Sequence, residues 1–387
     1  MLGKMQVLIM IVVVLTCFAF SGTAFADTEV SGIISQDTTW SKAGSPYIVK
    51  NTIQIAYGAS LTIKPGVIVN GFSNNIEVWG TLNSIGNDNS KITFNNVNIL
   101  VGEAVNYNEH YNINIQYSEI NYGSIMKSPT CGHGTFILRD STIQNTSSYI
   151  DLWYPSNNCF IERNIFNKAG GISVGTDGIK VYITNNAFYE QTTPYAVENW
   201  ADYSKDTINT IIEYNSFLST NKIALSLKKG YSNSHMIAIN NYWNTTDSAV
   251  IDSMIYDKKD NLACSDYIEY KPFLNNTNPS TPILEIPTYS SVQGYVYGIT
   301  NPSNIEVTLG NNITHTDQNG FFKFDNTQTG RYILKAKYLF CKCNPIDLTI
   351  INSEPINQNL ELIPGDYNSD NKIDLSDLIM FSRNYGR

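Results

Sequence analysis

A short phrase that recurs along the middle of the chain constrains the fold more than any other feature. It usually consists of a small polar residue followed two places later by a large apolar residue, as in Ser141-Thr142-Ile143. The apolar positions are 21 to 29 residues apart. A near-constant period in this range indicates supersecondary units that stack on one another. The apolar residues that close the repeats are Ile99, Ile120, Ile143, Phe166, Phe188, Phe217 and Trp243.

Each repeat holds short stretches in which apolar and polar residues alternate, as in Ile113/Ile115 and Phe136/Leu138. Alternation with a period of two predicts strands, whereas a helix would place apolar residues three and four apart. The Leu framework of leucine-rich repeats is absent. A coil with three short strands buries its inward side chains only when neighbouring coils stack on it. The sequence therefore predicts an all-β chain whose body, residues 27–274, is a right-handed parallel β-helix.

Four successive repeats carry Asn at the same place, namely Asn164, Asn186, Asn215 and Asn241. Asn tolerates the left-handed backbone that a sharp turn between strands requires. Stacked Asn side chains also form hydrogen-bonded ladders. We expect such a ladder here, and the alternative is a ligand-binding row of amides. The two longest intervals predict loops near residues 198–206 and 228–234.

The two ends of the repeat region have their own patterns, Gly58–Val67 at the front and Tyr270–Leu274 at the back. These stretches resemble the first and last coils of secreted β-helix repeat proteins with the pectate-lyase-like fold. The resemblance covers roughly residues 30–274. It implies a fold and leaves the activity open.

The first 26 residues are typical of a secretory signal peptide. Lys4 precedes an apolar run from Val7 to Phe20, and Ala24-Phe25-Ala26 offers small residues at a cleavage site before Asp27. The alternative is a membrane anchor, but the run is shorter than the roughly 20 residues that span a bilayer. No later stretch is apolar enough to span one, so we expect a secreted or cell-surface protein with no stable membrane span after cleavage.

The formal net charge is −9 and no basic cluster occurs, which argues against nucleic acid as a partner. Five cysteines remain after signal removal, and an odd count at irregular spacing does not indicate a disulfide framework. We interpret them as mostly buried thiols. They are Cys131, Cys159, Cys264, Cys341 and Cys343.

A polar, Pro-rich stretch at residues 275–288 predicts a linker. Residues 289–364 then show short strands separated by turn signals, which favours a small antiparallel β-sandwich. The expected strands are residues 292–296, 305–309, 321–324 and 332–336. The phrase Thr316–Phe324, followed by Gly330-Arg331-Tyr332, resembles the carboxypeptidase-regulatory-like domain. That resemblance implies a spacer or adhesion module, and direct sugar binding is the alternative.

The clearest chemical pattern lies near the C-terminus, where oxygen-bearing side chains occupy positions 1, 3, 5, 9 and 12 of a twelve-residue loop. This is the ligand spacing of an EF-hand-type calcium loop, in which position 7 contributes its backbone carbonyl. Position 6 is Asn371 where Gly is usual. A short amphipathic helix, residues 376–384, is expected to follow. The predicted calcium ligands are Asp366, Asn368, Asp370, Lys372, Asp374 and Asp377.

The segment 365–387 resembles one half of a type I dockerin, a calcium-dependent module that binds cohesin. The resemblance implies that Leu375 and Ser376, at loop positions 10 and 11, contact a cohesin partner. Only one loop–helix is visible where the family usually has two. A single copy could pair with another chain or fold against the preceding sandwich.

A complete catalytic set is not identified. Gly132-His133-Gly134 is similar to the Gly-His-Gly of polygalacturonases, but the acidic residues that should precede it are missing. Arg139-Asp140 and Glu162-Arg163 fall at one coil position and predict a stacked charged ladder. If the fold binds glycan, this is where we expect it, with Tyr117, Trp153 and Tyr154 as stacking platforms.

Three functions fit these patterns. The leading hypothesis is an exported β-helix protein that binds a polysaccharide or a cell-envelope glycan, tethered through calcium by the dockerin-like module. The second is a polysaccharide lyase or glycoside hydrolase of a cellulosome-like system. The third is a structural surface or adhesion protein.

Overall fold

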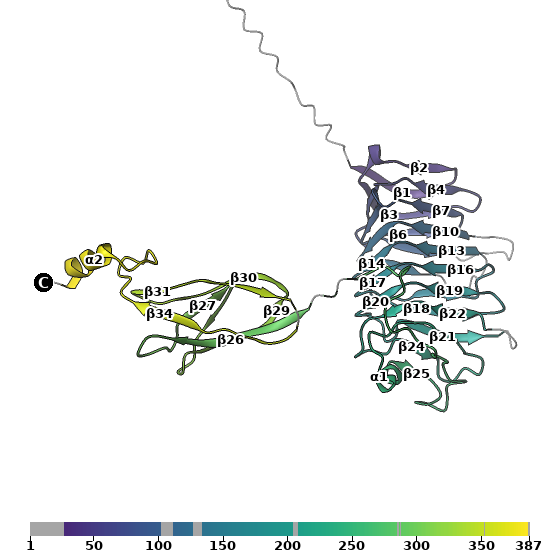
Figure 1. Cartoon of the computed structure of the whole chain (residues 1–387). Coiled ribbons are helices and arrows are strands. Elements are labelled where there is room, and N and C mark those ends of the chain that lie inside the picture. Colours follow the sequence, from purple (N-terminus) through teal and green to yellow (C-terminus); the bar gives the residue numbers. More distant parts are fainter. Residues whose placement is uncertain are drawn as a thin grey trace, which may run out of the picture. The chain divides into compact units, whose positions relative to one another are not determined.

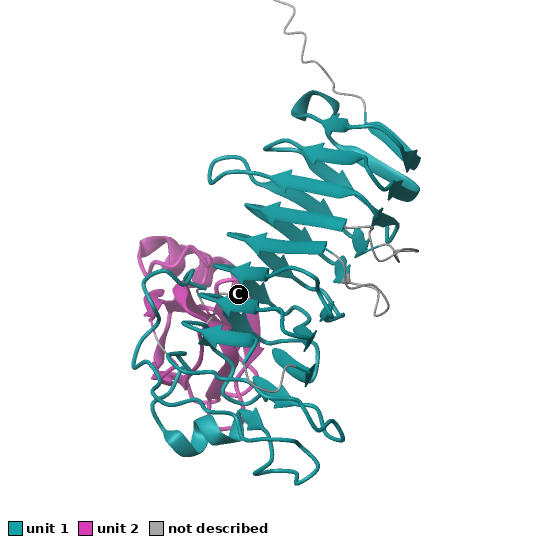
Figure 2. Cartoon of the chain, turned by 90° about the vertical axis from the view of Figure 1, so that its right-hand side faces the viewer, with its two compact units in different colours: residues 1–284 teal, residues 285–387 magenta. Residues whose placement is uncertain are grey.

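The computed structural model describes residues 27–101, 111–126, 134–203, 208–284, 286, 288–351 and 353–385. The chain divides after Leu284 into two compact units, which Figure 2 colours separately. The first is a stack of parallel strands, and the second has mostly antiparallel sheets and ends in helix α2 (Figure 1). The predicted order of a parallel β-helix followed by antiparallel sheets is confirmed. The predicted signal peptide, Cys131 and His133 lie outside the described residues.

The strands of the first unit form three faces, because each turn of the chain adds strands that pair in parallel with those of its neighbours. Strand β1 (Thr28–Ile34) begins the stack against β3 (Tyr47–Ile55). The two ends of β3 pair with different strands, β5 and β6, so β3 belongs to both face two and face three.

Face one is an eight-stranded sheet made of β2 (Thr38–Trp40), β4 (Ser60–Ile63), β7 (Thr81–Ile85), β10 (Tyr111–Gln116), β13 (Gly134–Arg139), β16 (Cys159–Glu162), β19 (Val181–Thr184) and β22 (Thr210–Glu213). Face two continues from β3 with β5 (Ile68–Asn70), β8 (Ile92–Asn95), β11 (Ser118–Asn121), β14 (Thr142–Gln144), β17 (Ile165–Asn167), β20 (Ala187–Tyr189) and β23 (Ser216–Phe217). Face three has β6 (Asn75–Val78), β9 (Asn98–Val101), β12 (Ser124–Met126), β15 (Ile150–Trp153), β18 (Ile172–Thr176), β21 (Val197–Asp202), β24 (Leu225–Leu227) and β25 (Ile255–Tyr256).

Inside the β-helix, equivalent apolar side chains stack in columns. The column on face two ends in rings with centroids 4.7 Å apart for Phe166 and Phe188, and 4.9 Å apart for Phe217 and Trp243. All of the predicted repeat-closing residues are buried. The column runs Val69, Phe94, Ile120, Ile143, Phe166, Phe188, Phe217 and Trp243.

The prediction that Ile99 is the first member of this column was wrong. Ile99 lies on face three, where β9 pairs it with Ile76 and Ile125, and Phe94 occupies the place beside Ile120. Both faces bury alternate residues, so the same short phrase occurs twice within one coil. Spacing alone does not distinguish the two occurrences.

The predicted Asn ladder is present and lies inside the β-helix. Asn186 Nδ2 donates to Asn215 Oδ1 (3.0 Å) and to Ile161 O (2.8 Å), while Asn186 Oδ1 accepts from Asn164 N and Asn164 Nδ2, each at 3.0 Å. Asn215 continues the pattern to Asn241 (3.0 Å). All four amides are fully buried. The ladder thus satisfies polar backbone groups at the corner between faces one and two.

The left-handed residue at this corner is the one before each ladder Asn, which corrects the sequence-based expectation. Arg163, Asn185, Tyr214 and Asn240 have φ values of 55° to 59°. The Asn side chain instead turns inward to bond the neighbouring coils. The sharp turn is thus made by the preceding residue, and the Asn that follows it directs its side chain into the β-helix.

The segment expected to be a linker lies partly on the β-helix. Thr281 is buried and its hydroxyl donates to Tyr214 O (2.6 Å). Asn185 Nδ2 donates to Asn278 Oδ1 (3.2 Å). Residues 278–281 therefore contact two of the corner residues and extend the first unit up to Leu284.

The second unit contains two sheets that enclose one core. Val292, Phe322 and Leu360 from one sheet pack in the same buried cluster as Val307 and Leu334 from the other. The first sheet contains β29 (Phe321–Gln328), β26 (Tyr289–Tyr297), β34 (Leu360–Pro364), β31 (Cys341–Cys343) and β33 (Ile356–Asn357). The second contains β28 (Asn312–His315), β27 (Glu306–Leu309), β30 (Gly330–Lys337) and β32 (Ile346–Ile350).

Two helices occur in the described residues. Helix α1 (Ser248–Ser253) begins at Asp247, whose carboxylate accepts from Ala249 N (2.8 Å) and caps it. Helix α2 (Leu375–Tyr385) ends the second unit. Neither is long and apolar enough to cross a membrane.

Replacing Asn186 with Ala should lower the free energy of unfolding of the β-helix by about 3 kcal/mol or more, because several buried polar groups lose their partners at once. Asn95→Ala is the matched control. Asn95 belongs to an outer, half-buried ladder with Asn70 and Asn121 (2.9 and 3.1 Å), and its loss should cost below about 1 kcal/mol. Chemical unfolding followed by circular dichroism measures both. Equal costs would contradict a special role for the inner ladder.

Candidate functional site

A groove of about 480 Å³ lies on the outer side of face three, over β15, β18, β21 and β24. It gathers carboxylates, indole rings and lysines in one hollow. The side chains on which its chemistry depends are Asp151, Trp153, Ser173, Glu198, Trp200 and Lys228.

The strand register places two carboxylates in one outward row. Asp151 of β15 pairs with Ser173 of β18, which pairs with Glu198 of β21. Neighbouring strands are about 4.8 Å apart, so the backbones of Asp151 and Glu198 are roughly 10 Å apart, with a small residue between them. All three residues of this row line the groove.

A β-bulge brings two indole rings together beside this row. The register of β18 and β21 shifts between Val174 and Gly175, which pairs with Ala201, so Trp200 is the extra residue. A bulge re-aims the side chain that it inserts. Gly175 is also the register partner of Trp153, and its lack of a side chain leaves the ring space. The centroids of Trp153 and Trp200 are 4.7 Å apart.

Glu198 is held from two sides and is only 4% exposed. Trp200 Nε1 donates to its Oε2 (2.7 Å), and Lys228 Nζ lies 3.4 Å from its Oε1. The same ammonium lies 3.8 Å from the centre of a Trp200 ring, within cation–π range. Pairing and hydrogen bonds of this kind offset the cost of burying a carboxylate. The three side chains form a fixed cluster at the floor of the groove.

Asp151 has a different environment from Glu198. Burial, assisted by the charge of Glu198, raises the pKa of Asp151 from 3.8 to about 6, and a hydrogen bond with Ser173 opposes this shift. Ser173 Oγ also accepts from Trp153 Nε1 (3.1 Å). Burial likewise raises the pKa of Tyr149, which lines the same groove, to about 12. Asp151 can therefore carry its proton in mildly acidic solution.

The predicted charged ladder exists, but it lies away from this groove. Arg139 Nε donates to Glu162 (2.6 Å), and Arg163 binds Asp140 through two nitrogens at 2.7 and 2.8 Å. Arg139 and Glu162 end strands β13 and β16 of face one, whereas Trp153 is on face three. The expectation that Trp153 and Tyr154 serve a glycan site beside the ladder was therefore wrong.

Sequence reasoning missed Asp151, Glu198, Trp200 and Lys228. Asp151 and Trp153 alternate with two buried apolar residues, and this alternation could have placed them together on an outer face. Glu198 and Trp200 were hidden because residues 198–206 were expected to be a loop. The structure instead has β21 at Val197–Asp202.

The predicted calcium loop, residues 366–377, bends back onto the sandwich and enters helix α2 at Leu375. Asp366 is buried, and its carboxylate accepts from Asp370 N (3.1 Å) and Asn371 N (2.9 Å). Asn371 has the expected left-handed backbone, with a φ of 64°. Its Oδ1 accepts from Cys343 N of β31 (3.1 Å). An Asn at position 6 therefore makes the turn and also anchors the loop.

The side chain at the last position of the loop, Asp377, is hydrogen-bonded to backbone amides of the same loop. Asp377 is buried and accepts from Asp374 N (2.8 Å) and Asn368 N (3.2 Å). Backbone amides, that of Asp374 first, hold the pKa of Asp377 below its usual value. Asp374 directly precedes helix α2, and its carboxylate accepts a hydrogen bond from Ser376 N in the first turn of that helix (2.8 Å).

The side-chain donors of the predicted ligand set are all oxygens, which fits calcium chemistry. However, among the described residues, no three His, Cys, Asp or Glu side chains surround a point where a metal ion could sit. Asn368 and Asp370 bond each other (Nδ2 to Oδ2, 3.0 Å), and Asp370 also accepts from Lys372 N (2.9 Å). The six predicted ligands share one loop, and their convergence on calcium remains a prediction.

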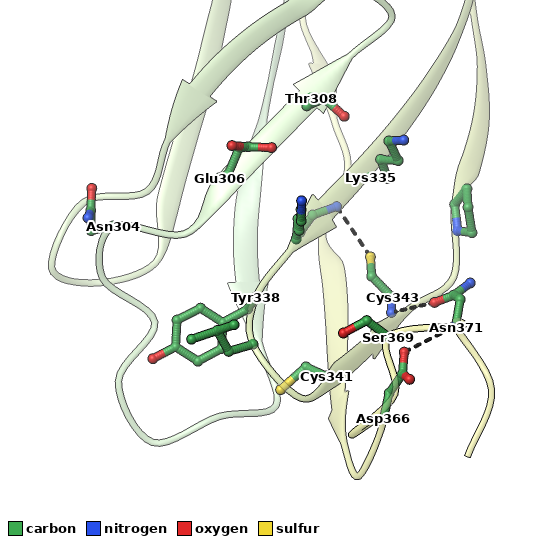
Figure 3. Close-up of a pocket in the computed structure, with 14 residues that line it drawn as sticks. Asn304, Glu306, Thr308, Lys335, Tyr338, Cys341, Cys343, Asp366, Ser369 and Asn371 are labelled. Carbon is green, nitrogen blue, oxygen red and sulfur yellow. Dashed lines mark hydrogen bonds between the residues drawn. The ribbon is translucent and has the colours of Figure 1, made fainter. Parts of the chain in front are cut away.

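A second hollow, of about 680 Å³, is lined by residues of this loop and of the sandwich (Figure 3). Asp366, Ser369 and Asn371 form one wall, and Glu306 and Thr308 of β27 lie across from them. The aromatic rings of Phe340, Tyr367 and Phe381 close the junction elsewhere, with centroids 5.1 and 4.9 Å apart. The loop–helix therefore contacts its own sandwich, which is one of the two arrangements expected for a single copy.

No protein-family model matches this chain, and no curated protein matches it significantly. Among solved structures, it is similar to an N-terminal-interface mutant of a type II cohesin–X–dockerin complex from Acetivibrio cellulolyticus, at 17% identity and a TM-score of 0.21, covering 24% of this chain and 72% of that one. A C-terminal-interface mutant of the same kind of complex gives 15% identity and a TM-score of 0.19, covering 23% and 70%. TM-scores this low establish neither a shared fold nor a shared function.

The unusual titration of Asp151 predicts a pH-dependent stability. Its folded pKa of about 6 lies above its unfolded value, so its favourable contribution is complete below about pH 4 and is lost as the pH rises through about 6. Asp151→Asn should therefore gain about 2 kcal/mol relative to the native sequence between pH 4 and pH 8. Unfolding at both pH values measures this gain. The same exchange at exposed Asp37 is the control, and identical pH dependence in both variants would refute the assignment.

Proposed function

We propose that this is an exported β-helix protein that binds a polysaccharide or a cell-envelope glycan in the groove on face three. The observation that carries this proposal is the Trp153–Trp200 pair beside the fixed carboxylate of Glu198. Ring faces pack on the apolar CH groups of sugars, while an adjacent charged acceptor binds sugar hydroxyls. The volume of the groove lies in the range typical of ligand sites.

The aromatic surface extends beyond the groove, which supports a polymer as the ligand. Tyr231 lies against Trp200, with centroids 5.4 Å apart. Tyr154 and Tyr203, which directly follow β15 and β21, stack with centroids 5.8 Å apart and are 38% and 46% exposed. Successive rings along one face offer successive contacts to a chain of sugar units.

Trp153→Ala should weaken glycan binding at least tenfold, because it removes one of the two paired rings. The matched control is Tyr57→Ala, an exposed aromatic residue of an early coil. Affinity electrophoresis in gels containing xylan, galactomannan, pectin or alginate, with sedimentation on peptidoglycan, measures binding. Retardation that is unaffected by Trp153→Ala, or absent with every polymer, would refute the groove as a glycan site.

We further propose that the C-terminal module attaches the protein to a cohesin-type partner in a calcium-dependent manner. Helix α2 offers exposed apolar side chains to such a partner, with Leu375 68%, Leu378 61% and Ile379 44% exposed. A shallow hollow of about 280 Å³ beside the helix includes Ile379 and Arg383. Calcium would be held by the residues of the predicted ligand set and would neutralise their carboxylates, which otherwise repel one another.

Calorimetry on the purified protein should detect one calcium site, and Asp366→Asn should weaken it at least tenfold because it removes a negative ligand. Asp325→Asn, at an exposed position of the sandwich, controls for the general loss of charge. Cohesin capture with and without chelator then tests the tether. Absence of binding heat would refute the calcium site, and capture that ignores chelator would remove calcium from the attachment.

A further inference from the structure

We propose that the glycan bound in this groove carries free amino groups, and that Asp151 binds one of their ammonium cations. This inference rests on the proposed glycan binding and adds the chemical class of the ligand. Three features of the groove support it, namely a carboxylate that lacks a cation, aromatic rings beside that carboxylate, and a second carboxylate that already has a cation of its own.

Asp151 has no positively charged partner. Within the part of the chain that the structure describes, no Lys, Arg or His side chain forms an ion pair with it. Its carboxyl group lines the groove and is hydrogen-bonded to Ser173 on the next strand. Removing a carboxylate from water costs free energy unless an opposite charge offsets that cost. The groove therefore favours a ligand that brings a positive charge over a neutral or acidic one.

Aromatic side chains flank this carboxylate. Tyr149, Asp151 and Trp153 are two residues apart along the chain, and all three line the groove. Trp153 Nε1 donates to Ser173 Oγ (3.1 Å), and the same hydroxyl bonds Asp151, so the indole is held next to the carboxyl group. The face of an aromatic ring attracts a cation, most strongly where both are partly removed from water. An ammonium at Asp151 would thus gain from the carboxylate and from the rings together.

The same groove already contains one arrangement of this kind, made by the chain itself. Lys228 Nζ lies 3.4 Å from Glu198 Oε1 and 3.8 Å from the centre of a Trp200 ring, so an ammonium sits between a carboxylate and an indole. Because Glu198 offsets the charge of Lys228, that charge opposes a second cation only weakly. Lys229 follows β24, three strands from β15 and so roughly 14 Å away along the backbone, where salt screens its charge from Asp151.

The probes are two oligosaccharides with one backbone, a chitosan hexamer with free amino groups and the fully acetylated chitin hexamer. Calorimetry on the purified protein at about pH 6.5, where Asp151 is mostly ionised, measures both affinities. The chitosan hexamer should bind at least tenfold more tightly, because only it offers an ammonium. Asp151→Asn should abolish this preference without weakening the binding of the chitin hexamer, and Asp37→Asn should keep the preference. Trp153→Ala should weaken the binding of both hexamers.

The outcomes separate the two proposals. Equal affinity for the two hexamers, or a preference that survives Asp151→Asn, would overturn the ammonium site and leave glycan binding in the groove intact. Binding of xylan, galactomannan, pectin, alginate or peptidoglycan but of neither hexamer would do the same. Absence of binding to both hexamers and to all five polymers would overturn the two proposals together. A circular dichroism spectrum of each variant checks that it is folded.

Discussion

The structure of the first unit depends on parallel strands stacking in register, so that each coil covers the apolar side chains of the next. A single coil has too little interior to be stable, and its free energy comes from its neighbours. The column that runs from Val69 to Trp243 supplies the apolar part of this contact. The Asn164–Asn241 ladder supplies the polar part, because a shift of one residue would break every amide contact at the corner. Together they allow one register only.

The groove is a consequence of that register. Pairing of β15, β18 and β21 aligns Asp151, Ser173 and Glu198 without any loop being involved. One departure from the regular ladder, the bulge at Trp200, then turns an indole toward Trp153 across the empty position at Gly175. The regular sheet sets the spacing of the row, and a single inserted residue creates the indole pair beside it. Sites built on strands in this way are more precisely held than sites on loops.

The sequence predicted the fold well because period and alternation report burial directly. The strands of face two, the inner Asn residues and the sandwich strands follow from which residues must be inside. It predicted the groove poorly, because alternation indicates that a residue points outward but not which outward residues of other strands lie beside it. Trp153 was noticed as an aromatic residue, but its partner Trp200 lies in a bulge that no local pattern indicates. Asp151 and Glu198 fall in one row only because each is the register partner of Ser173, and the three strands that carry these residues are well separated in the sequence.

The two proposed sites differ in what holds their charges. In the groove, Glu198 is compensated by Lys228 and Trp200, so the site is complete before any ligand arrives. Such preorganisation lowers the entropic cost of binding and keeps the field of the carboxylate fixed. In the loop 366–377, the buried carboxylates of Asp366 and Asp377 accept hydrogen bonds from backbone amides, and within the described part of the chain neither forms a salt bridge. Amide dipoles stabilise single carboxylates but do not cancel the repulsion between several of them. The proposed calcium ion would remove that repulsion, so under this proposal the loop, unlike the groove, would respond to the calcium concentration around it.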